Sequence, residues 1–231
     1  MKAKLTGGMY SFRWQPSTNV VPKFECFIRN YTNEPHTPNR KKATMSEIYI
    51  SGKTIDRSSE VVKGEYEDCV FNAYSFAGAN LSDYKFVNCE FTACDFSMAK
   101  LTNTAFRDVV FNECKMLGLA FNSCNVFGLS FSFNNCHLNH SSFYKTKLKK
   151  IVFRDSQLKD ADFTEADLSG VVFAHCDLDR AVFNQTNLEK ADFSTAYNFS
   201  LDPENNRMKK AKFSASTLGG LLGKYDLQIE R

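Results

Sequence analysis

The sequence predicts an all-β solenoid in which the chain turns a corner every five residues. Three observations predict it. A bulky apolar residue recurs at every fifth position from Phe71 to Phe193, a small or thiol-bearing residue usually stands two places before it, and polar residues fill the intervening positions. A period of five fits neither a lone helix nor a lone strand. Residues two apart on an extended chain point to the same side, so both apolar positions are expected to face inward and the polar residues to form exposed corners.

The apolar positions, which we call the beat, fall into two registers. The first runs from Phe71 through Val126 to Phe131, and the second from Phe133 to Phe193. Sixteen of the 22 phenylalanines lie on the beat, so phenylalanine is predicted to be the stacking unit of the core. Because Phe131 and Phe133 are only two apart, the frame slips at 131–133, and we expect a widened coil or bend near Asn134 and Asn135.

Segments Ala161–Glu165 (ADFTE) and Ala166–Gly170 (ADLSG) resemble the A(D/N)LXX signature of the pentapeptide-repeat family. The resemblance implies a right-handed quadrilateral β-helix with four pentapeptides per coil over roughly residues 61–213. Twenty residues per coil would place Phe71, Phe91, Phe111 and Phe131 on one face in successive coils, about 4.8 Å apart along the axis. Residues 66–193 would then form a rod about 30 Å long.

Residues 1–44 lie outside the repeat. They hold eight Lys or Arg against two acidic residues, contain four prolines and have no period, so we expect a basic, disordered N-terminal extension. Met45 is an alternative natural start, which leaves open whether 1–44 belong to the natural protein. Residues 45–65 are expected to form a lead-in segment and N-terminal cap before the β-helix of 66–197. No run of 18 apolar residues occurs, so we expect a cytoplasmic protein without a membrane partner.

Residues 198–231 should close the other end of the rod, because open strand edges need a cap or a partner. We expect a loop, a final strand around Ala211–Phe213 and a short apolar cap, with a helix begun by Ser216 as one option. Other family members commonly dimerise through this end, so the resemblance implies a homodimer, and a monomeric cap is the alternative. The candidate cap or dimer residues are Leu218, Leu221, Leu222, Tyr225, Leu227 and Ile229.

The eight cysteines are best explained by packing. All but Cys26 stand two places before a beat residue, where a small polarizable side chain fits among rings. No C-x2-C pair occurs, and the nearest metal-like cluster, Cys136 with His137 and His140, splits one inward thiol from two outward imidazoles. No catalytic motif is present either. We therefore expect no metal, no cofactor, no catalytic residues and no enzymatic activity.

Charge is divided unevenly along the chain. The total is +3, residues 1–44 contribute +6, and residues 45–231 therefore carry −3. Within Ile151–Asp192 the net charge is −5, which approaches the charge density of duplex DNA, on the order of six negative charges per 10 Å. The basic run Lys145–Lys150 precedes this stretch. The acids of the candidate partner-binding surface are Asp155, Asp160, Asp162, Glu165, Asp167, Asp177, Asp179, Glu189 and Asp192.

A narrower resemblance bears on function. Residues 131–138 (FSFNNCHL), the alternation of Phe and Leu after them, and residues 202–207 (DPENNR) resemble the microcin-immunity pentapeptide proteins. That branch and the quinolone-resistance branch are associated with DNA gyrase and imitate duplex DNA. The resemblance implies a protein that binds DNA gyrase or topoisomerase IV and protects it from inhibitors or toxins. A general protein-interaction or regulatory scaffold with no topoisomerase role is the alternative. We expect no direct nucleic-acid binding, and we interpret the basic arm as a solvated tail.

Overall fold

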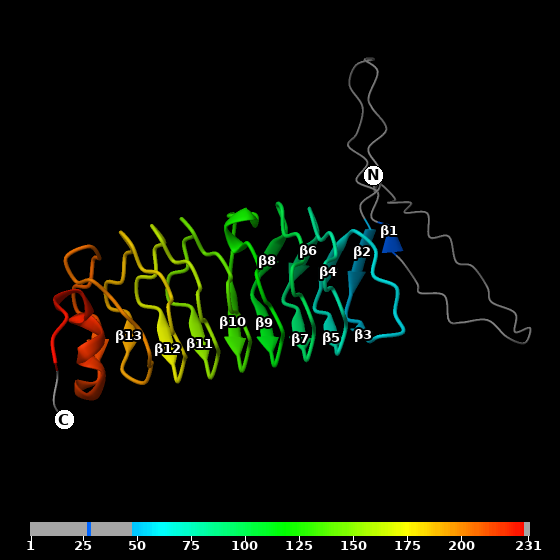
Figure 1. Cartoon of the computed structure of the whole chain (residues 1–231). Helices are drawn as coiled ribbons and strands as arrows, with labels where there is room; N and C mark the ends of the chain where they lie inside the picture. Colours follow the sequence, from blue (N-terminus) through cyan, green and yellow to red (C-terminus); the bar gives the residue numbers. More distant parts are fainter. Residues whose placement is uncertain (1–26, 29–47, 229–231) are drawn as a thin grey trace, which may run out of the picture.

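The computed structural model describes residues 27–28 and 48–228, which form a straight rod built from coiled turns (Figure 1). One long side of the rod is a nine-stranded parallel sheet with one strand from each turn. Eight steps of about 4.8 Å make this sheet roughly 40 Å long. Its strands, in order along the rod, are β3 (Thr54–Ile55), β5 (Val70–Asn72), β7 (Glu90–Thr92), β9 (Val109–Asn112), β10 (Phe131–Asn134), β11 (Val152–Arg154), β12 (Val172–Ala174), β13 (Asp192–Phe193) and β14 (Lys212–Phe213).

A second sheet covers the N-terminal half of another side. Four of its five strands are parallel, and β1 pairs antiparallel with β2. In order they are β1 (Phe27–Ile28), β2 (Ile48–Ser51), β4 (Glu65–Glu67), β6 (Lys85–Val87) and β8 (Ala105–Arg107). The expectation of disorder for 1–44 falls mostly on residues outside the described ranges. Among the described residues, no helix has both the length and the apolar character needed to cross a lipid bilayer.

The rod has four walls, which confirms the expected β-helix. Wall 1 is the nine-stranded sheet. Wall 2 carries a ladder of single bridges that joins His137, Gln157 and Asp177, and wall 3 carries the ladder Ser142, Asp162 and Val182. Wall 4 is the five-stranded sheet in the N-terminal half, and in the C-terminal half it is the ladder Lys147, Asp167, Asn187 and Arg207.

Backbone conformation explains why the chain turns at every fifth residue. The residue two places after nearly every beat residue has a left-handed backbone, as at Asp83 (φ 63°) and Arg180 (φ 55°). The residue before the beat stabilises the same turn, because its side chain accepts a hydrogen bond from the second backbone N–H beyond it. Asp162 Oδ1 accepts from Thr164 N at 2.9 Å. The Asp or Asn of the repeat is therefore a turn-forming residue, as predicted.

The core confirms the predicted ladders. Beat residues on successive turns lie ring over ring, as in Phe121 and Phe143, whose centroids are 4.7 Å apart with planes inclined by 4°. Rings on opposite walls meet edge to face across the core, as in Phe143 on wall 3 and Phe153 on wall 1 at 85°. Both arrangements are favourable for aromatic pairs. The small residues two places earlier are also buried, which leaves one continuous apolar core.

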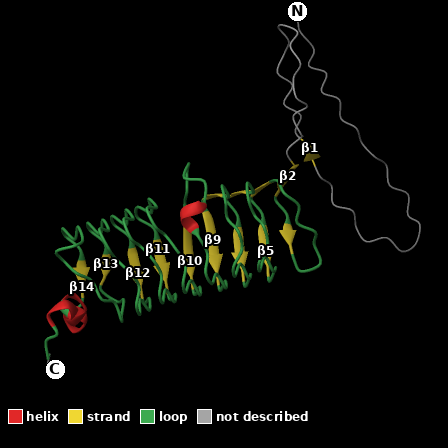
Figure 2. Cartoon of the chain, turned by 45° about the horizontal axis from the view of Figure 1, so that its top comes forward, coloured by secondary structure: helices red, strands yellow, loops and turns green. Residues whose placement is uncertain are grey.

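Val126 is the exception among the beat residues, and its predicted inward position is wrong. Ladder partners are twenty residues apart on either side of the slip but 22 apart across it. Phe133, and not the expected Phe131, therefore continues the column of Phe71, Phe91 and Phe111, while Phe131 lies beside Val109. The two extra residues lie on wall 4, in the loop that follows the short 3-10 helix η1 (Phe121–Ser123; Figure 2). The loop lifts Val126 into solvent, where it is 83% exposed, and Phe131 enters the core instead.

The expected widening near Asn134 and Asn135 is also wrong. Asn134 lies in the regular strand β10, and Asn135 forms an ordinary left-handed corner. The distortion lies one wall earlier, because a loop on the outside of the rod absorbs two residues without moving the aromatic ladders. Phe131 contacts Phe121 at 5.3 Å and Phe133 at 5.0 Å between ring centroids.

At the C-terminal end, β14 pairs with β13, as predicted for the segment Ala211–Phe213. Two 3-10 helices follow, η2 (Ala215–Leu221) and η3 (Gly223–Tyr225). The helix begins two residues earlier than expected: Ser214 is the N-cap, and its side chain accepts a hydrogen bond from Ser216 N. Ser214 takes this role because it directly follows β14 in an extended conformation, which is the usual backbone of an N-cap.

The seven described cysteines are all buried and unpaired, as the packing interpretation predicted. Five of these thiols donate to carbonyl groups of the neighbouring turn, as Cys114 Sγ does to Phe91 O at 3.3 Å. Burial raises the pKa of Cys124 and Cys176 to about 12, so these thiols stay protonated at neutral pH. Cys136 is buried while His137 and His140 are exposed, which confirms the predicted division. Cys26 lies outside the described residues.

Candidate binding surfaces

The nine acids of the candidate partner surface do not meet on one wall. Wall 2 and its corner hold three of them, Asp160, Asp177 and Asp179. The other six are spread over the remaining walls and corners. Asp155 and Asp192 belong to wall 1, Asp162 and Glu165 to wall 3, and Asp167 and Glu189 to wall 4.

Seven of the nine acids form ion pairs. Most partners lie one turn away along the rod, eighteen or twenty residues distant in sequence, as in Lys145 with Glu165 (3.3 Å) and Arg207 with Glu189 (2.7 Å). Only Asp155 and Asp162 have no ion pair within the described ranges. The seven pairs are Asp160–Arg180, Glu165–Lys145, Asp167–Lys149, Asp177–Lys159, Asp179–Arg180, Glu189–Arg207 and Asp192–Lys212.

Four of these partner cations come from outside the acidic stretch. Lys145 and Lys149 belong to the turn before it, and Arg207 and Lys212 to the turn after it. Counting charges along the sequence therefore overstates the negative charge of the surface, because charges on a solenoid are neighbours along the rod. These ion pairs could have been found from the sequence, because a charged residue and its partner on the neighbouring turn differ by about twenty in residue number.

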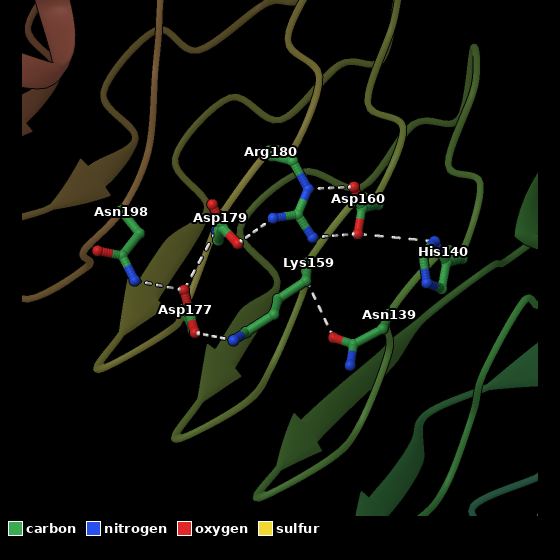
Figure 3. A network of polar contacts seen from close by, with 8 residues as sticks. All are labelled: Asn139, His140, Lys159, Asp160, Asp177, Asp179, Arg180 and Asn198. Carbon is green, nitrogen blue, oxygen red and sulfur yellow. Dashed lines mark hydrogen bonds and ion pairs between the residues drawn. The ribbon is translucent and has the colours of Figure 1, made fainter.

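Wall 2 carries the densest polar network (Figure 3). The Arg180 guanidinium binds both Asp160 carboxylate oxygens, at 2.7 and 2.9 Å, and also Asp179 at 2.6 Å. Lys159 Nζ lies 3.1 Å from Asp177 Oδ2, and Asn198 Nδ2 donates to the other Asp177 oxygen at 2.9 Å. Three carboxylates thus share two cations and an amide, which leaves one unbalanced negative charge before His140 is counted.

The pKa values of these acids follow from their partners. Hydrogen bonds from Arg180 hold the pKa of Asp160 below its ordinary value. Burial works to raise the pKa of Asp177, but the bonds from Asn198 and Lys159 outweigh it, so this pKa is also lowered. Both carboxylates are therefore ionised at neutral pH. A rigid, paired carboxylate of this kind stabilises a turn and has little capacity for proton transfer.

The C-terminal end exposes an apolar surface. Of the six predicted cap or dimer residues, Leu221 packs against the core, while Leu218, Leu222, Tyr225 and Leu227 are 36–57% exposed. Ile229 lies outside the described residues. A cluster of exposed side chains at one end of a solenoid is typical of an interaction surface.

Two more exposed apolar residues, Val126 and Phe127, lie on the wall 4 loop, and sequence reasoning missed them. Asn125 accepts a hydrogen bond from Phe127 N at 2.9 Å, and its amide donates to Asn103 at 2.8 Å, so the loop is fixed to the turn beneath it. Within the described part of the chain, no three His, Cys, Asp or Glu side chains group where they could hold a metal ion.

Comparison with known proteins agrees with this architecture. The model of the pentapeptide repeat region family matches residues 84–163 and 119–193. Residues 84–193 therefore form a repeat region of the pentapeptide-repeat family. Comparison with curated protein sequences gives no match.

Solved structures of other repeat proteins are similar to this chain. Two trypsin-treated forms of QnrB1, a plasmid-mediated fluoroquinolone resistance protein, match with a TM-score of 0.53 and 19% identity. Each match covers 80% of this chain and 98–100% of QnrB1. HetL, a pentapeptide repeat protein from the cyanobacterium Nostoc sp. strain PCC 7120, matches at a TM-score of 0.25 with 12% identity, over 70% of this chain and 87% of HetL. At these identities the likeness to QnrB1 establishes a common fold.

Proposed function

We propose that this protein is a non-catalytic, cytoplasmic binding factor that contacts DNA gyrase or topoisomerase IV and protects it from an inhibitor or toxin. The observation that carries the proposal is the fold common to this chain and QnrB1, a plasmid-mediated fluoroquinolone resistance protein. Both are stiff rods of stacked turns, and a stiff rod presents a fixed pattern of surface charges to a partner. The contact surface in this proposal is the acidic set defined above.

Within that set, Asp155 and Asp162 are the acids best suited to contact a partner. Neither carboxylate forms an ion pair with a cation among the described residues, so both can pair with cations of another protein. The seven paired acids would first have to exchange one partner for another, which gives little net free energy. A DNA-like role for this rod therefore depends on a few free carboxylates rather than on the whole acidic stretch.

Purified gyrase tests the proposal in a supercoiling assay with and without a fluoroquinolone. The wild-type protein should restore supercoiling at micromolar concentration. The double variant Asp155→Lys/Asp162→Lys should lose that protection, while the matched control Glu60→Lys/Asp68→Lys, which changes two exposed acids near the other end, should keep it. Absence of binding, protection and inhibition with the wild-type protein would remove the topoisomerase proposal.

We further propose that two copies associate through the C-terminal end. The apolar surface formed by Leu218, Leu222, Tyr225 and Leu227 supports this, because two copies that meet there would cover it and close both open ends. Leu222→Glu/Leu227→Glu should convert a dimer to a monomer in light scattering without changing the circular dichroism spectrum. A monomeric wild-type protein at high micromolar concentration would contradict this proposal.

A general interaction scaffold is the second candidate function. The pairing of seven acids and their spread over four walls favour it, because a DNA mimic needs its negative charges on a continuous surface. Affinity for gyrase separates the two candidate functions. A scaffold should leave gyrase activity unchanged under all conditions.

A further inference from the structure

We infer that wall 4 of the C-terminal half binds the phosphate backbone of a nucleic acid duplex. Five exposed lysines on this wall and its edge define what we call the basic wall: Lys147, Lys150, Lys190, Lys209 and Lys210. None of the five is paired with a carboxylate within residues 48–228. The surface is independent of the acidic set in the proposed function and does not rest on that function.

The geometry of the wall brings the five lysines together. Lys147 begins the bridge ladder of wall 4, which continues through Asp167 and Asn187 to Arg207. Lys150, Lys190 and Lys210 occupy the same corner on three of four successive turns, each with a left-handed backbone at φ 59–61°, and Gly170 occupies it on the turn after Lys150. Lys190 N donates to Lys209 O at 2.9 Å, which joins the last two turns directly.

The carboxylates of this stretch are already in use. Asp167 accepts from Asn187 at 2.8 Å and pairs with Lys149 at 3.2 Å, and Glu189 pairs with Arg207 at 2.7 Å. These carboxylates are already neutralised by other cations, so the five lysines add positive charge that has no counterpart on this wall. Like charges on adjacent turns repel one another, so the protein tolerates a destabilising arrangement that a bound anion would relieve.

Gly170 contributes to the continuity of the stripe. It occupies the corner between Lys150 and Lys190, with φ at +72°, and a Cβ atom there would lie 3.5 Å from Lys150 Cγ. Because that space holds no side chain, the aliphatic part of Lys150 lies across the corner. No side chain on the turn of Gly170 therefore separates Lys150 from Lys190.

The shape of the charged surface selects the kind of anion. On the flanking walls Lys145 is neutralised by Glu165 and Lys212 by Asp192, while Arg154 on wall 1 has no carboxylate partner among the described residues. The unpaired lysines form a line about 15 to 20 Å long, with two on the turn of Lys150, none on the turn of Gly170, one on the turn of Lys190 and two on the turn of Lys210. A line of cations on a rigid rod fits a linear polyanion, whereas a bilayer surface needs a plane of charge and apolar groups that insert. The lysines reach phosphates and read no bases, so binding should be independent of sequence.

The test uses full-length protein and a fluorescent 24-base-pair duplex, with dissociation constants measured by anisotropy at several salt concentrations. The variant Lys150→Gln/Lys190→Gln/Lys210→Gln should weaken binding on the order of a hundredfold at 0.1 M salt and reduce the salt slope by about 2.7, since each of the three phosphate contacts contributes about 0.9. The control Lys53→Gln/Lys100→Gln/Lys115→Gln removes the same charge from three exposed, unpaired lysines elsewhere and should change little.

Mass spectrometry of lysine acetylation locates the contact in the same complex. The duplex should protect Lys150, Lys190 and Lys210 and leave Lys53 and Lys100 reactive. The inference is overturned by no measurable binding, by equal losses in both triple variants, or by protection confined to residues 1–44. It is also overturned if poly-glutamate of equal charge displaces the duplex at equal concentration, because an acidic protein would then be the better ligand.

Discussion

Replacement of Phe163 by alanine measures how much the aromatic ladder stabilises the rod. Phe163 is fully buried, with its ring centroid 5.0 Å from those of both Phe143 and Phe183, at interplanar angles of 6° and 14°. It also meets Phe153 and Phe173 edge to face, at 6.2 and 5.8 Å. Removal of such a ring loses its transfer free energy and leaves a cavity that four rigid neighbours cannot fill. The expected loss in the free energy of unfolding is about 3–5 kcal/mol.

Val126→Ala is the matched control, because Val126 belongs to the same beat but is 83% exposed. The expected change is within about 0.5 kcal/mol, as for surface substitutions generally. Urea unfolding followed by far-UV circular dichroism measures both, since the single tryptophan, Trp14, lies outside the described residues. Phe163→Asp should prevent folding of the second half, because it buries an unpaired charge. Equal unfolding midpoints for the wild type, Phe163→Ala and Phe163→Asp would refute the stacking account.

Three further predictions follow from other contacts. Asn206→Ala should lower the free energy of unfolding, measured with urea, by about 2–3 kcal/mol. The buried Asn206 amide accepts a hydrogen bond from Thr186 N at 2.9 Å and donates to Phe183 O and Asp202 O, each at 3.0 Å. A loss no larger than that of the exposed control Asn122→Ala would contradict this prediction. The pKa values of Asp160 and Asp177 are lower in the folded protein than in the unfolded chain. Their contribution to the free energy of unfolding is therefore complete above about pH 5 and is lost as the pH falls below about 4. An unfolding midpoint unchanged between pH 6 and pH 3 would disprove this prediction. In a Cys26→Ser variant, the remaining thiols should react with Ellman's reagent only as fast as the protein unfolds, and rapid labelling of the native protein would show them to be accessible.

The regular part of the fold could be predicted because one physical requirement repeats. Each beat residue must enter a narrow core in which rings from opposite walls meet, as Phe163 meets Phe153 and Phe173, so every fifth residue has to be apolar. The irregular part could not be predicted in the same way. Val126 and Phe131 both satisfied the apolar pattern, and only packing in three dimensions decides that the larger ring enters the core while the valine stays outside. The cap position had the same limit, since Ser214 and Ser216 are equally good N-cap residues in sequence.

The candidate surfaces were predicted less well than the fold. The acidic stretch was identified from neighbours along the chain, but charges interact with neighbours in space. Glu165 meets Lys145 and Glu189 meets Arg207, one turn away, and both partners lay outside the stretch that was counted. The same reasoning concealed the basic wall, because Lys150 and Lys190 are forty residues apart in sequence and lie on the same corner of the rod.

Hydroxyl-radical footprinting with mass spectrometry tests most directly whether the beat residues fill the interior of the rod. Phe127 is an internal reference, since it is 77% exposed and only one residue from a beat position. We predict rapid oxidation of Phe127 and protection of Phe143, Phe153 and Phe163 until the protein unfolds. Oxidation of these three rings at the rate of Phe127 in the native protein would contradict the account.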